Sequence, residues 1–199
     1  MGEVGGKRAP RVKPQMVMTA QPAPAKKTIA LVGLSGVGKS SIGRRLATAL
    51  GLPFRDADAE VEAAAGRAIS EIFDQFGEEA FRDGERRVIA RLLSEPPHVL
   101  ATGGGAFMHP ETRRLIKQRA ISIWLKADLD VLARRVVRKE HRPLLAGKDP
   151  LAVLTAQAAD RYPAYAEADI VIETGETAHN VTVDAIVKAL AARAAEAAS

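Results

Sequence analysis

Residues Gly33 to Ser40 read Gly-Leu-Ser-Gly-Val-Gly-Lys-Ser and match the pattern G-x-x-x-x-G-K-[ST] at every fixed position. This pattern is typical of a loop that binds the phosphate groups of a nucleotide. Glycines allow backbone N–H groups to converge on phosphate oxygens, because no Cβ blocks the approach. Lys39 supplies a positive charge for the β- and γ-phosphates, and the Ser40 hydroxyl is suited to a bound Mg²⁺. The spacing therefore predicts a site for a magnesium nucleoside triphosphate.

Two further groups of residues follow strand-like segments. Asp56 and Asp58 come after the short segment 53–55, and the glycines 103–105 come directly after the segment 98–102. Ligands of open parallel sheets bind at the carboxyl ends of the strands, so we expect both groups beside the phosphate loop. One carboxylate could hold a magnesium-bound water and the other a substrate hydroxyl, or the pair could be a solvated acidic turn. The glycines are either a flexible connection or a backbone surface that touches a ligand.

Several arginines are candidates for binding anions. Arg82 lies beside the apolar Phe81 in a helical pattern, and Arg161 lies near the end of another helix. Basic residues also gather between 134 and 142, just before Pro143. Any of these could be a solvated surface charge. Beside a bound triphosphate, the 134–142 cluster would instead be a lid whose cations stabilise the transferring charge.

The pattern of apolar residues shows which elements must position these groups. Short apolar runs alternate with segments of helical periodicity, which is typical of an α/β fold with a parallel sheet. The predicted strands are 28–32, 53–55, 98–102, 121–125 and 168–172. The predicted helices are one from the loop to Gly51, then 58–65, 78–94, 110–119, one starting at Asp128, 150–162 ending before Pro163, and 180–197. We therefore predict one three-layer domain.

Composition narrows the class of protein. The chain has 199 residues, of which 47% are hydrophobic, and this suits a single domain with a substantial core. The absence of cysteine excludes disulfides and thiolate metal sites and suits a reducing cytosol. No uncharged run is long enough to predict a membrane span.

The positive charge of the chain is concentrated at its start. The net charge is +5, and residues 1–27 contain six basic residues and one acidic residue, so residues 28–199 are neutral overall. Residues 1–27 are also rich in proline and glycine, and we expect them to be a disordered basic tail preceding a domain at 28–199. A neutral domain argues against nucleic acid as a partner.

Taken together, these motifs resemble the shikimate kinase family, a group of small P-loop kinases related to the nucleoside monophosphate kinases. The resemblance covers about residues 28–190 and rests on the order of several motifs. These are G-L-S-G-V-G-K-S at 33–40, D-A-D at 56–58, G-R at 66–67 followed by I-S-E-I-F, G-E-x-x-F-R-x-x-E at 77–85, G-G-G at 103–105, R-P-L-L at 142–145 and R-x-x-x-Y at 161–165.

The resemblance implies a five-stranded parallel sheet in the order 2-3-1-4-5 and a lid near 139–150. It implies ATP as cosubstrate, Mg²⁺ as cofactor and phosphorylation of the 3-hydroxyl of shikimate, a step of the chorismate pathway to aromatic amino acids. We expect a cytoplasmic enzyme, a monomer, that binds shikimate and ATP and neither nucleic acid nor a membrane.

The resemblance also implies a role for individual residues. Lys39, Asp58 and Arg142 would be catalytic, and Ser40 and Asp56 would hold the metal. ATP would contact Ser35, Gly36, Val37, Gly38, Lys39, Ser40, Ser41, Arg135 and Arg142. Shikimate would contact Asp58, Arg82, Gly103, Gly104, Gly105 and Arg161, with the two arginines clamping its carboxylate. Glu173-Thr174 departs from the Asp-Thr pair that many members have before the adenine loop.

Three alternatives remain at this level. A kinase for another polyol acid, such as gluconate, would share the phosphate loop but should lack the combination of D-A-D, F-R and G-G-G. A non-catalytic homologue would bind ATP or shikimate as a regulator, although it need not retain the whole set of Lys39, Ser40, Asp58 and Arg142. A nucleic-acid-binding protein is the third alternative.

Overall fold

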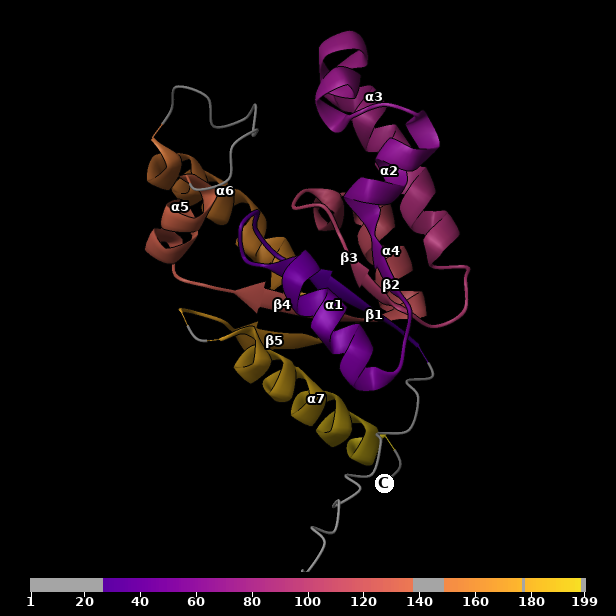
Figure 1. Cartoon of the computed structure of the whole chain (residues 1–199), viewed down its shortest axis with the longest axis vertical. Helices are drawn as coiled ribbons and strands as arrows, with labels where there is room; N and C mark the ends of the chain where they lie inside the picture. Colours follow the sequence, from indigo (N-terminus) through magenta and orange to yellow (C-terminus); the bar gives the residue numbers. More distant parts are fainter. Residues whose placement is uncertain (1–26, 138–148, 177, 198–199) are drawn as a thin grey trace, which may run out of the picture.

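The structure is a computed structural model that describes residues 27–137, 149–176 and 178–197 (Figure 1). The predicted tail, apart from Lys27, lies outside the described residues. So does most of the predicted lid, including Arg142. The described part of the chain contains no helix that is both long and apolar enough to cross a membrane.

Five strands form a parallel sheet in the order β2-β3-β1-β4-β5. Their bounds are β1 Thr28–Val32, β2 Phe54–Asp56, β3 Val99–Ala101, β4 Ala120–Lys126 and β5 Ile170–Glu173. The central strand β1 is buried along its whole length, as expected for an apolar run covered on both faces. The predicted strand order and parallel arrangement are confirmed.

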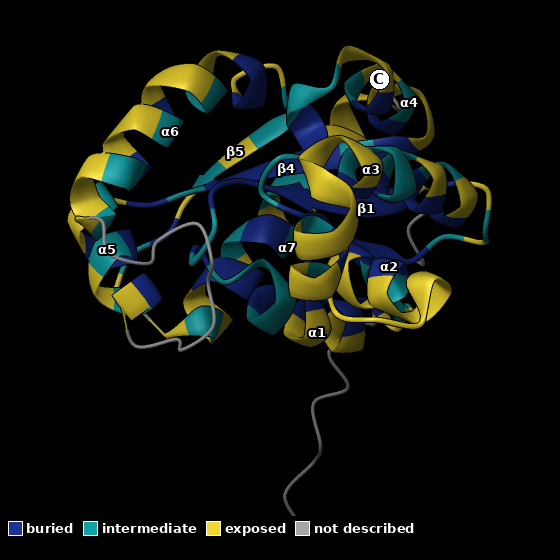
Figure 2. Cartoon of the chain, turned by 90° about the horizontal axis from the view of Figure 1, so that it is seen from above, coloured by how far each residue is buried: buried dark blue, intermediate teal, exposed yellow. Residues whose placement is uncertain are grey.

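Helices cover both faces of this sheet. Their bounds are α1 Lys39–Leu50, α2 Ala57–Ala65, α3 Ile69–Leu92, the 3₁₀ turn η1 Ala106–Met108, α4 Pro110–Arg119, α5 Leu129–Val137, α6 Pro150–Tyr165 and α7 His179–Glu196. Helices α1 and α7 lie on one face, and α4 and α6 lie on the other (Figures 1 and 2). Figure 2 shows the buried residues concentrated in the strands and on the helix faces turned toward them. The result is the predicted three-layer architecture.

Helix α3 is longer than the predicted helix 78–94, because another helical segment leads directly into that one. It starts at Ile69 and passes through Gly77, whose φ of 81° and ψ of 175° interrupt the helical backbone. Glycine tolerates this positive φ without the steric cost that a Cβ would add. Two helical segments therefore meet at Gly77 with no loop between them.

Helix α6 also differs, because it does not end before Pro163. It continues to Tyr165, with Pro163 inside its last turn. Proline removes one backbone donor and usually ends a helix. Here the last turn places Tyr165 in the core, where none of its surface is exposed. This burial favours continuation of the helix.

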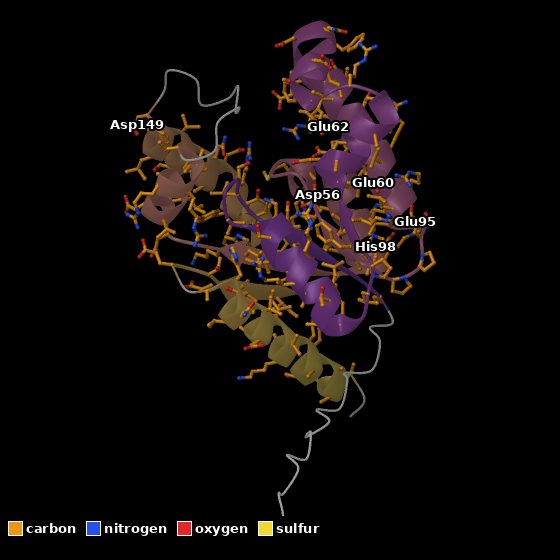
Figure 3. The ribbon with its side chains drawn as sticks, viewed as in Figure 1. Asp56, Glu60, Glu62, Glu95, His98 and Asp149 are labelled. Carbon is orange, nitrogen blue, oxygen red and sulfur yellow. The ribbon has the colours of Figure 1, made fainter. Side chains whose placement is uncertain are left out.

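The carboxyl ends of the strands point toward the part of the fold that has α2 and α3 on one side and α5 and α6 on the other (Figure 1). Asp56, at the carboxyl end of β2, lies where the strands end, whereas His98, just before β3, lies where the strands begin (Figure 3). The fold thus brings the polar segments that follow β1, β2 and β3 to one place.

Candidate active site

The phosphate loop joins β1 to α1. Gly38 occupies the N-cap position of α1 with φ 99° and ψ 20°, a left-handed conformation that glycine adopts readily. Helix α1 then starts at Lys39, so its free N–H groups and the positive end of its dipole face the loop. This combination favours an anion at the loop.

Lys39 folds back over this loop. Its Nζ donates to the carbonyl oxygens of Gly33 at 2.8 Å and Leu34 at 3.1 Å. The ammonium group is therefore held at the start of the loop, and it lines the cleft described below.

Ser40 and Asp56 bring a hydroxyl and a carboxylate together. Ser40 Oγ donates to Asp56 Oδ2 at 2.6 Å, and Asp56 Oδ1 accepts from the backbone N–H of Asp58 at 3.2 Å. The second bond caps the N-terminus of α2. Asp56 is thus held by one hydrogen bond to α1 and one to α2.

A single cleft contains most of the predicted nucleotide residues and Asp58. It is lined by Ser35, Gly36, Gly38, Lys39, Ser40, Ser41, Asp56, Asp58, Thr102 and Gly104. Val37 does not line it, because its side chain is fully buried beneath the loop. The cleft is predominantly polar and combines amides, hydroxyls, an ammonium group and two carboxylates. These groups are suited to bind a phosphate ester and a metal ion.

Magnesium is compatible with this cleft. The described residues contain no cluster of three or more His, Cys, Asp or Glu side chains able to hold a metal alone. Mg²⁺ commonly takes only one or two protein oxygens and completes its shell with water and substrate phosphates. The Ser40 hydroxyl and the Asp56 carboxylate, 2.6 Å apart, provide such a pair of oxygens.

Arg82, on α3, lies against the glycine triplet. A Cβ placed on Gly105 would be 2.7 Å from the Arg82 guanidinium, so only glycine leaves room for this approach. The guanidinium donates to Glu85 at 2.7 Å and to Glu78 at 3.1 Å, and it stacks over the ring of Phe81. Arg82 is thus held in place from its own helix while its side chain remains partly exposed.

Glu85 is an almost fully buried carboxylate beside this arginine. Burial raises the pKa of Glu85, and the Arg82 guanidinium opposes that rise. Glu85 Oε1 has no hydrogen-bond partner among the described residues, and it lies against Gly103 together with Asp58. The sequence prediction gave Glu85 no role, although its position three residues after Arg82 on a helix is the spacing at which ion pairs form.

Arg161, on α6, lies against Gly104 of the same triplet. Arg161 Nη1 donates to the carbonyl oxygen of Gly104 at 3.3 Å, and the Tyr165 hydroxyl donates to the same oxygen. Gly104 in turn packs against Ser35 of the phosphate loop. Gly104 therefore lies between the phosphate loop and Arg161, while Gly105 lies against Arg82.

Arg135, on α5, does not line this cleft and lies beside the loop that follows β5. Its Nη2 donates to the carbonyl oxygen of Gly175. His179, at the start of α7, lies between this loop and Gly38. Partial burial and the charges of Arg45 and Arg135 lower the pKa of His179. The sequence prediction missed His179, because nothing in its local sequence links it to the phosphate loop.

The structure thus brings together the phosphate loop, Asp56, Asp58, Arg82, the three glycines and Arg161. Arg135 lies outside this group, beside the loop that follows β5, and Arg142 lies outside the described residues. Thr102, whose hydroxyl donates to the carbonyl oxygen of Leu31 at 2.9 Å, is a further cleft residue that the prediction omitted. Its position at the end of a predicted strand was the available signal.

Comparison with known proteins gives a consistent result. The family model described as shikimate kinase matches residues 35–191. The shikimate kinase of Caulobacter vibrioides (strain NA1000 / CB15N) is 72% identical over 164 residues, which cover 82% of each chain. That of Paramagnetospirillum magneticum is 55% identical over 164 residues, covering 82% of this chain and 84% of the relative.

A solved structure agrees with these sequence matches. The shikimate kinase of Acinetobacter baumannii in complex with shikimate superimposes with a TM-score of 0.81 at 37% identity, covering 84% of this chain and 94% of the other. The family model covers well over half of the chain, and the curated relatives are far above 30% identity. The chain therefore belongs to the shikimate kinase family.

Proposed function

We propose that this protein transfers the γ-phosphate of ATP to the 3-hydroxyl of shikimate, giving ADP and shikimate 3-phosphate. The observation that carries the proposal is the cleft that combines the phosphate loop with Asp58 and Gly104, where Arg161 lies against Gly104 and Arg82 against Gly105. The phosphate loop is suited to a nucleotide, and the glycines and arginines are suited to a small hydroxylated acid. Family membership supports the same reaction.

On the nucleotide side, the loop amides and Lys39 would bind the β- and γ-phosphates. Lys39 donates to two loop carbonyls, and binding of a nucleotide would exchange these bonds for bonds to phosphate oxygens. Ser35, Gly36, Val37, Gly38, Ser40 and Ser41 complete the proposed loop contacts. By the family resemblance, Arg135 would stack on the adenine, and its hydrogen bond to Gly175 in the loop after β5 supports this place.

Ser40 and Asp56 would hold Mg²⁺. The ion supplies charge stabilisation at the phosphate oxygens when it is bound. Asp56 would accept a hydrogen bond from the Ser40 hydroxyl or from a metal-bound water, and its bond to the Asp58 N–H keeps it oriented toward the cleft.

On the substrate side, Arg82 and Arg161 would bind the carboxylate, because planar guanidinium groups suit bidentate carboxylate recognition. Gly103, Gly104 and Gly105 would form the wall between them. Asp58 would accept a hydrogen bond from the attacking hydroxyl and take its proton. The hydroxyl oxygen then forms a bond to the γ-phosphorus while the bond from that phosphorus to the β-phosphate oxygen breaks.

By the family resemblance, Arg142 and a lid near 139–150 would cover the bound phosphates. Residues 1–27 would be a disordered basic tail outside the 28–199 domain. We also propose that the enzyme acts as a monomer in the cytoplasm, within the chorismate pathway.

A coupled assay of ADP release tests the function. It uses the full chain with Mg²⁺ and ATP and compares shikimate with quinate, gluconate and glycerate as acceptors. We expect turnover with shikimate to exceed turnover with each other acid by at least a hundredfold. Comparable turnover of gluconate would establish the alternative polyol-acid kinase. Binding of shikimate without ADP release would establish a non-catalytic homologue.

A further inference from the structure

The last turn of α6 carries a residue that no proposed substrate contact uses. Arg161 and Tyr165 are one helical turn apart, so they lie on the same face of the helix. Both donate to one acceptor, the carbonyl oxygen of Gly104. A carbonyl oxygen has two lone pairs, so these two donors occupy both of them. The position of each donor therefore affects the other.

Tyr165 is the more constrained of these two donors. It is completely buried, and its ring lies 5.8 Å from that of Trp124 and 6.4 Å from that of Phe107, measured between ring centroids. Burial raises the pKa of Tyr165 to about 12, although the nearby Arg161 charge opposes the shift. The hydroxyl consequently remains protonated at neutral pH and acts as a donor to Gly104.

Gly104 connects this tyrosine to the reacting groups. A Cβ placed on Gly104 would lie 3.2 Å from Ser35 Oγ and 3.5 Å from Arg161 Nη1, so the residue lies between the phosphate loop and the arginine. It also lines the cleft with Lys39 and Asp58. Fixing the Gly104 carbonyl thus fixes the distance between Arg161 and the phosphate loop.

We propose that Tyr165 is a positioning residue for the acid substrate. Its hydroxyl fixes the Gly104 carbonyl and thereby orients the Arg161 guanidinium toward the substrate carboxylate. This inference rests on the proposed function, because it takes Arg161 as a carboxylate ligand. The continuation of α6 through Pro163 serves the same arrangement, since a helix that ended at Tyr162 would not carry Tyr165 to Gly104.

The Tyr165→Phe variant tests this proposal, because it retains the ring and removes only the hydroxyl. We expect the KM for shikimate to rise roughly five- to tenfold, the effect of losing one buried hydrogen bond. The kcat and the KM for ATP should change less than twofold. Tyr162→Phe is the matched control, since the Tyr162 hydroxyl forms no hydrogen bond with the described residues. It should leave all three constants unchanged.

A double-variant cycle shows whether Tyr165 acts through Arg161. If it does, Tyr165→Phe should raise the KM for shikimate in the wild-type background but less than twofold in an Arg161→Lys background. A Tyr165 that only stabilised the fold would change the melting temperature and affect KM equally in both backgrounds. Equal effects in both backgrounds would overturn the proposal, and so would an unchanged KM in Tyr165→Phe.

Binding of shikimate provides a measurement that does not depend on turnover. The chain has one tryptophan, Trp124, which packs against Tyr165, so its fluorescence reports on this region. The Kd of Tyr165→Phe for shikimate should rise by the same factor as KM, and an unchanged Kd would contradict the inference. Wild-type protein that neither binds nor phosphorylates shikimate would instead refute the proposed function.

Discussion

The Ser40 hydroxyl donates to Asp56 Oδ2 at 2.6 Å across a sequence separation of 16 residues. This bond joins the first turn of α1 to the end of β2, so the phosphate loop and the neighbouring strand share one oxygen-rich corner of the cleft. Asp56 also caps α2, and it therefore affects both the proposed metal site and local stability.

Asp56→Asn separates these two roles. Asparagine caps helices about as well as aspartate, so the melting temperature should change by no more than about 2 °C. The lost charge should raise the Mg²⁺ concentration needed for half-maximal activity by roughly tenfold. The measurement is a Mg²⁺ titration of ADP release, with the exposed Asp160→Asn as control. An unchanged Mg²⁺ requirement would show that Asp56 does not serve the metal.

Arg161→Ala should raise the KM for shikimate by roughly two orders of magnitude, because one of the two cations proposed to bind the carboxylate is lost. The KM for ATP should change little. Initial rates measured with each substrate varied separately check this expectation. Arg86→Ala, which removes a partly exposed arginine paired with Asp83 on α3, is the control. A similar rise in both KM values would indicate general damage to the site.

Gly105→Ala tests the close approach of Arg82. The new Cβ would lie 2.7 Å from the guanidinium, so Arg82 must move, and the KM for shikimate should rise at least tenfold. Gly84→Ala is the matched control on α3, since a Cβ there meets nothing within 4 Å. That variant should retain activity and gain about 0.5–1 kcal/mol of stability from helix propensity. Wild-type kinetics in Gly105→Ala would place Arg82 outside the substrate site.

The raised pKa of Tyr165 predicts that the stability of the protein falls in a specific alkaline pH range. This pKa is about 12 in the folded protein and about 10 in the unfolded chain, so the folded state holds this proton more tightly. The resulting stabilisation is complete below pH 10 and is lost as pH rises toward 12. In Tyr165→Phe, the fall in unfolding free energy over this range should therefore be less steep, by up to about 1.4 kcal/mol per pH unit.

Urea unfolding at several values between pH 9 and pH 11.5 measures this slope. The two proteins share all their lysines and arginines, so those groups affect both curves in the same way. Tyr162→Phe should change the slope less, because Tyr162 is only partly buried. Parallel curves for wild type and Tyr165→Phe would show that the hydroxyl is not held protonated by the fold.

Arg142→Ala tests the proposed lid residue, which lies outside the described residues. If its charge acts mainly in the transition state, kcat should fall by roughly two to three orders of magnitude while shikimate affinity changes less. Single-turnover and steady-state rates, with Arg134→Ala as control, distinguish these effects. Arg134 is an exposed arginine of α5 paired with Glu176. An intact kcat would remove Arg142 from the catalytic set.

The sequence by itself determined the class of fold, and it indicated the positions at which we propose that ligands bind. Local signals were sufficient for this, because the glycine loop, the apolar strands and the helical periodicities each depend on residues close together in the chain. The loop at 33–40, the acidic pair at 56 and 58 and the glycines at 103–105 all follow predicted strands, and parallel strands end at one edge of the sheet.

Only the tertiary structure decided which side chains contact one another. The continuation of α6 through Pro163 depends on the burial of Tyr165 against Trp124 and Phe107, which come from other elements. Likewise, the contact of Gly104 with Ser35 joins segments that lie far apart in the chain. Such contacts are decided by packing between distant segments, and local propensity cannot encode them. For this reason the family resemblance of the sequence could imply Arg161 as a ligand, while the role proposed for Tyr165 required the fold.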